Sequence, residues 1–138
     1  SPSVDVRVSG KDLEYFRHHS SRVSGPMNWV TSSGVKGLDS CTLALVPAKS
    51  PSRKYTVRLF FAEPDALAPG QRRFDVTLQG RPALSDFDIA KETRGAGKSL
   101  IKEFKGVVVT GELRLAFKPA ARSAGKPLLC GLQVIAEK

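Results

Sequence analysis

Few of the features that identify an enzyme's active site are present in this chain. Its two histidines, His18 and His19, are adjacent, so in a helix or a strand they point in different directions. It contains neither a G-x-S-x-G nucleophile motif nor an H-E-x-x-H zinc motif. Glu63 with Asp86 or Asp88 could form the carboxylate pair of a glycosidase, but carboxylates at strand ends more often accept backbone hydrogen bonds in loops. We therefore predict that the protein is not an enzyme.

Cysteine is also scarce. The chain has two, Cys41 and Cys130, and no C-x-x-C motif, which excludes a zinc ribbon and a thioredoxin-type site. Both lie in apolar, strand-like segments, and this context favours buried free thiols. A disulfide between them remains an alternative, which requires neighbouring strands with Cα atoms within about 7 Å.

No motif for a metal ion is present either. Asp86 and Asp88 flank Phe87, so both are expected to project to the side opposite it. Two such carboxylates could hold Ca²⁺, but that ion needs six or more oxygen ligands, and no EF-hand spacing occurs. Ion pairs with nearby arginines explain these acids more simply: Arg72, Arg73 or Arg81. We expect the protein to require no metal and no other cofactor.

Long apolar runs are missing as well. None approaches the roughly 18 residues that a helix needs to span a bilayer. The chain opens SPSVDVRV, without an initiator Met or the basic and apolar regions of a signal peptide. At 138 residues it can bury about two-thirds of its unfolded surface, and no linker or repeat divides it. We expect residues 1–138 to form one domain, excised from a larger protein, with no membrane partner.

Charge is abundant, and basic residues outnumber acidic ones by 22 to 13, giving a net charge of +9. Such a balance raises the question of nucleic acid. The bases are scattered along the whole chain rather than clustered in a long run, so we expect no nucleic-acid partner. Residues 89–126 carry nine bases against three acids, and they could form a patch for an anionic polymer. The alternative is a solvated basic surface that keeps the domain soluble.

Alternation of apolar and polar residues is the dominant pattern, and it predicts an all-β fold. Glu112–Lys118 shows it well, because Leu113, Leu115 and Phe117 share one face. Predicted strands are Val4–Val8, Trp29–Thr31, Cys41–Val46, Tyr55–Ala62, Phe74–Gln79, Phe87–Ile89, Leu100–Phe104, Val107–Val109, Glu112–Lys118 and Leu129–Ala136. Only Lys11–His18 has helical character, and Thr110-Gly111 is expected to form a tight hairpin. Short strands separated by Gly and Pro turns indicate an antiparallel two-sheet β-sandwich.

One segment carries a recognisable signature between Tyr55 and Ile89. Its motifs are Phe61-Ala62-Glu63, Gln71-Arg72, Phe74-Asp75-Val76, Gly80 and Asp86-Phe87-Asp88-Ile89. They resemble malectin and the malectin-like domains, which read F-A-E, a loop, Q-[RK]-x-F-D-V-x-[LV]-x-G and D-[FL]-D-I. A looser resemblance continues through Gly111–Leu115 and Pro127–Ile135.

The resemblance implies a jelly-roll sandwich of the galactose-binding-like type and a non-catalytic carbohydrate-binding function. Malectin of the endoplasmic reticulum binds a diglucose unit, and malectin-like domains also occur in plant receptor kinases and appended to bacterial secreted glycan-processing proteins. By this resemblance the chain is expected to be a bacterial-type module of a secreted, periplasmic or cell-surface protein. Its partner would be a glycan or polysaccharide, neutral or anionic.

Two departures from malectin keep other functions open. Where malectin carries a Tyr-Phe pair after F-A-E, this chain has Asp65 and Ala66, and malectin's aspartate before the closing strand is replaced by the run Ser123–Lys126. One alternative is a protein–protein or structural sandwich module that has lost the sugar site and contacts other domains of its own chain. Another is a binder of anionic polysaccharide through the basic surface.

Trp29 is the predicted ligand platform, supported by Tyr15, Glu63, Asp65 and Lys126 at the loop ends. The C–H face of a sugar packs on an exposed aromatic ring, and its hydroxyls need partners that donate and accept. Most other large aromatics fall on apolar strand faces and are expected to fill the core. Two structural alternatives remain: Trp29 could pack inside the sandwich, and the Glu63 carboxylate could tie the loop Asp65–Gly70 together through backbone N–H groups.

Overall fold

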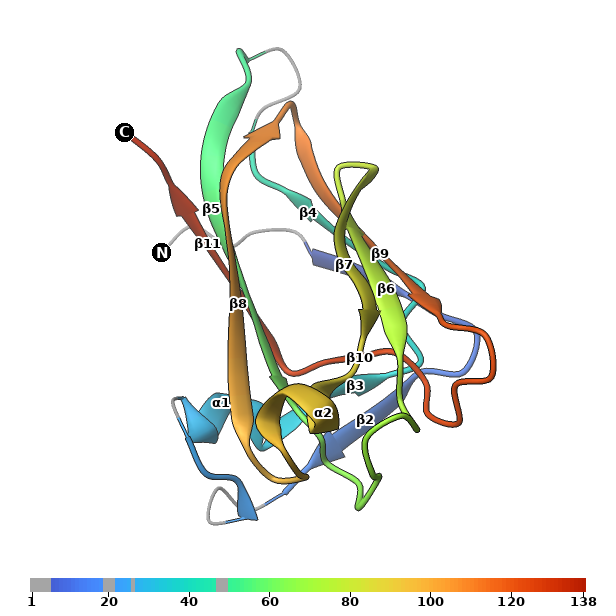
Figure 1. The fold of residues 1–138 in the computed structure, drawn as a ribbon. Coiled ribbons are helices and arrows are strands. Elements are labelled where there is room, and N and C mark those ends of the chain that lie inside the picture. The colour runs from blue at the N-terminus through green and yellow to red at the C-terminus, as the bar shows by residue number, and fades with distance from the viewer. Residues whose placement is uncertain (1–5, 19–21, 26, 47–49) are drawn as a thin grey trace.

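Two antiparallel sheets stack face to face in the computed structural model of this chain, and a small third sheet closes one end (Figure 1). The structure describes residues 6–18, 22–25, 27–46 and 50–138, with only the backbone of Asn28 and Trp29. The five-stranded sheet has the order β1 (Val6–Ser9), β4 (Ser40–Ala44), β9 (Glu112–Pro119), β6 (Phe74–Leu78) and β7 (Arg81–Phe87). The opposing sheet has the order β11 (Gly131–Ala136), β5 (Arg53–Ala62) and β8 (Ser99–Val109).

The small sheet has the order β10 (Leu128–Leu129), β3 (Ser33–Lys36) and β2 (Glu14–Arg17). It lies at the lower end of the sandwich in Figure 1, near the helices α1 (Asn28–Thr31) and α2 (Ile89–Thr93). All strand pairs within the three sheets are antiparallel. The predicted antiparallel two-sheet sandwich is therefore confirmed.

The core lies between the two large sheets and follows from the alternation in the sequence. In β5, Tyr55, Val57, Leu59 and Phe61 are buried on the inner face. The β6 and β9 strands contribute alternate residues in the same way. Phe60 is also buried, although it points to the opposite face of β5. A Cβ at the neighbouring Gly131 would lie 3.4 Å from the Phe60 ring and 2.6 Å from the Val30 side chain of α1. The sheet–helix contact therefore forms a second, smaller layer outside the main core.

Three local predictions are wrong. The predicted strand Trp29–Thr31 lies in the helix α1, and the segment with helical character, Lys11–His18, contains the strand β2. The predicted strand Phe87–Ile89 spans the end of β7 and the start of α2, where the Asp88 carboxylate accepts the N–H of Lys91 at 3.1 Å. This is an N-cap contact, which starts a helix by satisfying one of its free N–H groups. The predicted strand Val4–Val8 begins outside the described residues.

The turn at Thr110-Gly111 is tight, but it does not form a hairpin between paired strands. It joins β8 to β9, and these strands belong to different large sheets (Figure 1). The chain thus crosses from one layer of the sandwich to the other at Gly111, whose φ is +79°. The predicted strands Leu100–Phe104 and Val107–Val109 are parts of the single strand β8, which passes through Gly106 at φ +70°.

Membrane-spanning helices and metal clusters were both searched for in the described part of the chain. None of its helices has the length and hydropathy needed to cross a bilayer. Among the same residues, no group of three or more His, Cys, Asp or Glu side chains is placed to hold a metal ion.

Candidate functional site

A buried ion pair lies at the loop end of the sandwich, between the end of β5 and the start of β6. The Arg72 Nε donates to the Glu63 Oε1 at 2.7 Å, and the two side chains are 3% and 0% exposed. The other oxygen of Glu63 accepts the N–H of Asp65 at 3.1 Å. Because both oxygens are engaged and shielded from solvent, Glu63 acts here as an internal counter-ion that holds the following loop.

Arg72 ties this pair to two further segments. Its Nη2 donates to the Asp65 carboxylate at 2.8 Å, and its Nη1 donates to the backbone carbonyl of Lys126. A Cβ at Gly125 would lie 2.9 Å from the Arg72 Cζ, so a larger residue there would displace this arginine from its contacts. The guanidinium therefore joins the loop after β5, the segment before β6 and the loop before β10.

Asp65 is the exposed member of this network. Its side chain is 42% exposed and lies between two cations, the guanidinium of Arg72 and the ammonium of Lys36, which donates at 3.0 Å. Lys36 also lies 3.6 Å from the carboxylate of Glu14. The loop after the F-A-E motif therefore presents a solvent-facing carboxylate that ion pairs hold in place.

A small hollow of about 210 Å³ opens beside Asp65. We call it the loop-end hollow; its lining residues are His18, Arg22, Val23, Glu63, Pro64, Asp65, Ala66, Ala96 and Gly97. The His18 Nδ1 lies 3.0 Å from the Arg22 Nη1, which places an imidazole and a guanidinium on the wall. The hollow thus offers a carboxylate acceptor and nitrogen donors to the same small ligand.

The remaining predicted site residues lie at varying distances from this network. Tyr15 is 74% exposed on the edge strand β2, but its neighbour Glu14 is the residue that faces Lys36. Successive strand residues point to opposite faces, so Tyr15 is turned away from Asp65. The ammonium of Lys126 lies 3.5 Å from the carbonyl of Asp12, and only its backbone joins the network. The side chain of Trp29 lies outside the described part of the structure.

Sequence reasoning missed Arg72 and Lys36 as parts of this site. Arg72 could have been predicted, because it lies in the same motif series as Glu63 and a basic residue there can pair with the Glu63 carboxylate. Nothing in the sequence indicates Lys36, because its contact with Asp65 depends on how the small sheet packs against the sandwich.

The two acids weighed as a calcium pair point to different partners. Asp86 has a φ of +50°, which breaks the expected strand alternation, and its carboxylate pairs with Arg73 at 2.7 Å. Asp88 instead caps α2 and accepts the N–H of Gly70. The expected ion pair with a nearby arginine therefore accounts for Asp86, whereas Asp88 caps a helix, a role that was not predicted from the sequence.

Both cysteines are free, and Cys130 gives a test of the packing around the site. Burial raises the pKa of the Cys130 thiol to about 12. The thiolate is the reactive species, so at pH 8 only about one thiol in 10⁴ is ionised. We expect Cys130 to resist alkylation by iodoacetamide at pH 8 in the folded protein and to react readily in 6 M guanidinium chloride. Mass spectrometry of the labelled protein measures the extent of alkylation at Cys130. Fast labelling without denaturant would show that the Cys130 thiol is exposed to solvent, contrary to this prediction.

Residues 47–129 match the family model described as the malectin domain. This chain belongs to the malectin domain family. A relative from Arabidopsis thaliana, a probable leucine-rich repeat receptor-like serine/threonine-protein kinase, is 35% identical over 74 residues, which are 49% of this chain and 7% of the kinase. The chain thus spans a small fraction of that relative's length.

Solved structures agree on the fold of this malectin domain. The ANXUR1 extracellular domain from Arabidopsis thaliana superposes with a TM-score of 0.75 at 16% identity, over 94% of this chain and 40% of that one. Bacteroides uniformis β-glucuronidase 2 superposes with a TM-score of 0.73 at 11% identity, over 95% of this chain and 14% of that one. At such identities the likeness establishes the shared sandwich alone.

Proposed function

We propose that this malectin domain is a non-catalytic carbohydrate-binding module of a larger secreted or cell-surface protein. The observation that carries the proposal is the loop-end hollow beside Asp65, which directly follows the F-A-E motif. Malectin's Tyr-Phe pair falls in the same loop. In this chain Trp29 would supply the aromatic platform, and Asp65 would orient the sugar.

The chemistry of the hollow suits a polyhydroxylated ligand. A sugar hydroxyl both donates and accepts a hydrogen bond, and the hollow combines the Asp65 carboxylate with Arg22 and His18. Its volume of about 210 Å³ is below the range of about 300–1,000 Å³ found for drug-sized ligands. A single sugar ring at the end of a glycan therefore suits it better than an extended chain.

Catalysis is disfavoured by the geometry of the two nearest carboxylates. A paired-carboxylate glycosidase needs both groups at the scissile bond. Glu63 lines the hollow but is 1% exposed, and its two oxygens already accept hydrogen bonds from Arg72 and from the N–H of Asp65. Asp65 alone would then be left to contact the ligand, and one carboxylate can orient a sugar without hydrolysing it.

A second candidate is a protein–protein or structural module that has lost the sugar site. It is favoured by the absence of malectin's Tyr-Phe pair at Asp65 and Ala66 and by the two cations that already hold Asp65. In that case the loop end would bind a neighbouring domain or another protein.

A glycan array with variants separates the two functions. We expect binding to neutral glucans, its loss in both Trp29→Ala and Asp65→Ala, and its retention in Asp86→Ala, which removes an exposed, ion-paired aspartate elsewhere. If Trp29 is a platform, its replacement should lower the free energy of unfolding by no more than about 1.5 kcal/mol, whereas loss of a core tryptophan costs about 3–5 kcal/mol. An array without binding to any neutral glycan would support the second candidate. A strongly destabilised Trp29→Ala variant would show that Trp29 packs in the core and is not a ligand platform.

A further inference from the structure

The strand β2 has a free edge at the lower end of the sandwich in Figure 1. It pairs with β3 on one side, and in the described part of the chain no strand lies on its other side. The N–H of His18, just after β2, donates to the carbonyl of Ser32 at 2.7 Å, so its backbone is directed toward β3. Backbone groups of successive strand residues point to alternate sides, and those of Tyr15 and Arg17 therefore point to the free edge. They offer two N–H groups and two carbonyls to another strand.

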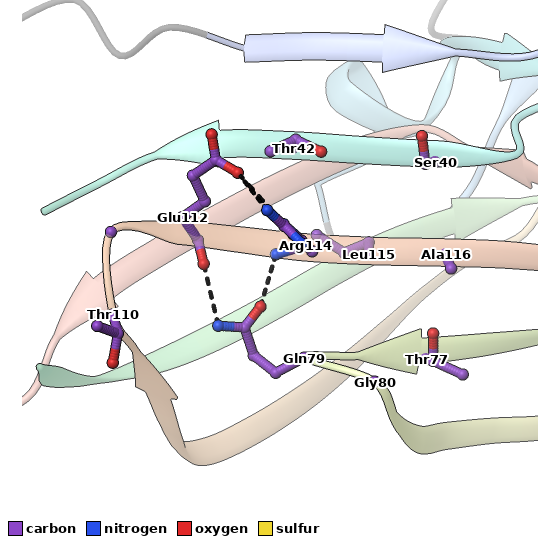
Figure 2. A pocket seen from close by; sticks show the side chains of 11 residues that line it. Ser40, Thr42, Thr77, Gln79, Gly80, Thr110, Glu112, Arg114, Leu115 and Ala116 are labelled. Carbon is purple, nitrogen blue, oxygen red and sulfur yellow. Dashed lines mark hydrogen bonds and ion pairs between the residues drawn. The ribbon is translucent and has the colours of Figure 1, made fainter. Parts of the chain in front are cut away.

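Two other edge strands are protected against pairing with a further strand. On β8 the carbonyl of Val108 accepts the Gln79 amide at 3.2 Å, and the same amide donates to the carbonyl of Glu112 at 3.0 Å (Figure 2). The strand β7 contains Pro82, and its register against β6 shifts twice. Proline and an irregular register both hinder edge-to-edge pairing. The strand β2 has no proline and no register shift, so its edge is open to a partner.

The sequence of this edge is complementary to itself. The five residues from Glu14 to His18 read Glu-Tyr-Phe-Arg-His. A second copy related by a twofold axis at Phe16 would place Tyr15 opposite Arg17 of the second copy. These two residues carry the free backbone groups, so each such pair would exchange two hydrogen bonds. A guanidinium beside a tyrosine ring is also a favourable cross-strand pair.

The remaining side chains of this pairing fit as well. Glu14 would lie opposite His18 of the second copy, and the two Phe16 rings would meet at the axis. Tyr15 is 74% exposed and the Glu14 side chain is 62% exposed, so both can reach a partner. In the next register, centred on Tyr15, both Glu14 and Arg17 would lie opposite apolar side chains of the second copy. The pattern of charged and aromatic residues therefore selects one register.

We propose that the domain forms a twofold dimer through antiparallel pairing of β2 with β2 of a second copy. The pairing joins the small sheets of the two copies into one continuous sheet. A strand of four residues makes an interface smaller than the roughly 1,600 Å² of stable complexes. The dimer is therefore weak and forms at high protein concentration.

The dimer also brings a residue of the second copy to the loop-end hollow. His18 lines that hollow, and Glu14 lies on the side of β2 that faces Lys36 and Asp65. Opposite residues of an antiparallel pair share one face of the sheet, so Glu14 of the second copy lies beside His18 at the wall of the hollow. Each hollow is then completed by the other copy. Dimerisation does not depend on the ligand of the hollow, so a failure of either proposal leaves the other standing.

Sedimentation velocity over a dilution series from millimolar to micromolar protein measures the association. We expect the mass to approach twice 14.9 kDa at the highest concentration. Tyr15→Arg should raise the dissociation constant of the dimer about tenfold or more, because it sets two guanidiniums opposite each other. Tyr15→Arg/Arg17→Tyr should restore the wild-type value, because the two side chains have only exchanged places in the pair. Val108→Arg is the matched control: it adds the same charge at a side chain that is 50% exposed on β8, and it should leave the dissociation constant unchanged.

Cross-linking checks the register independently. Phe16→Cys places two thiols opposite each other at the axis, in a pair without backbone hydrogen bonds whose Cα atoms lie about 4.5 Å apart, within reach of a disulfide. Mild oxidation should give a covalent dimer of this variant. Tyr15→Cys should give far less, because its two thiols are offset along the strands.

Four outcomes would overturn the proposal. The first is a wild-type domain that stays monomeric at every concentration, and the second is an equal effect of Tyr15→Arg and Val108→Arg. The third is a failure of Tyr15→Arg/Arg17→Tyr to recover the dimer, because the pairing would then have another register or another surface. The fourth is equal cross-linking of Phe16→Cys and Tyr15→Cys, because chance collisions would then explain both.

Discussion

Replacing Arg72 by methionine should lower the free energy of unfolding by about 3–5 kcal/mol, because it leaves the buried charge of Glu63 unpaired. The Glu63 side chain is 0% exposed and its Oε1 lies 2.7 Å from the Arg72 Nε, so water cannot replace the lost donor without opening the loop end. The same substitution also frees the carbonyl of Lys126. Since small domains are stable by only about 5–15 kcal/mol, the variant would lose a large share of its stability.

Urea unfolding followed by circular dichroism measures this effect. Arg58→Met removes an arginine from an exposed ion pair and should cost no more than about 1 kcal/mol. Glu63→Gln keeps an oxygen for the N–H of Asp65 while removing the charge, so Glu63→Gln/Arg72→Met should be more stable than Arg72→Met alone. If Arg72→Met and Arg58→Met cost the same, the loop end is open to solvent and the pair is not a buried one.

The sequence predicted the large sheets better than the small one, and the reason is burial. In β5, β6 and β9 one face packs on the core, so apolar residues must alternate with polar ones. The strands β2 and β3 are short and only partly covered, and they lack that pattern. Gly34 makes this strand harder to predict, because a Ser-Gly pair is typical of turns. A Cβ there would lie 2.6 Å from the carbonyl of Leu129, so glycine is used for close approach between strands.

The candidate site was predictable only where its parts are neighbours in the signature. Glu63 and Asp65 were found because they follow a clear strand and the F-A-E motif. The cations that hold them depend on tertiary placement, as the contact of Lys36 with Asp65 shows over 29 residues of sequence. The alternation of apolar and polar residues shows which β9 residues face outward. The strand order that places Ser40 and Thr77 beside them cannot be read from any single strand.

Replacing Phe61 by alanine should lower the free energy of unfolding by about 3–5 kcal/mol, because the site is fully enclosed. Phe61 is 0% exposed, and its ring centroid lies 4.8 Å from that of Phe87 and 6.1 Å from that of Phe74. These rings join β5 of one sheet to β6 and β7 of the other. Removing the central ring leaves a cavity between two sheets that are each held by backbone hydrogen bonds and cannot easily collapse into it.

Tyr15→Ala is the control for this substitution, because it also removes an aromatic ring but from a side chain that is 74% exposed. We expect it to change the free energy of unfolding by no more than about 0.5 kcal/mol. Parallel urea titrations of the two variants measure the difference, and the slope of each transition checks that both unfold in one step. A loss below about 1.5 kcal/mol for Phe61→Ala would mean that the sheets close over the gap. The aromatic cluster would then be a flexible contact, and the rigidity that the loop-end hollow needs would have to come from the Arg72 network.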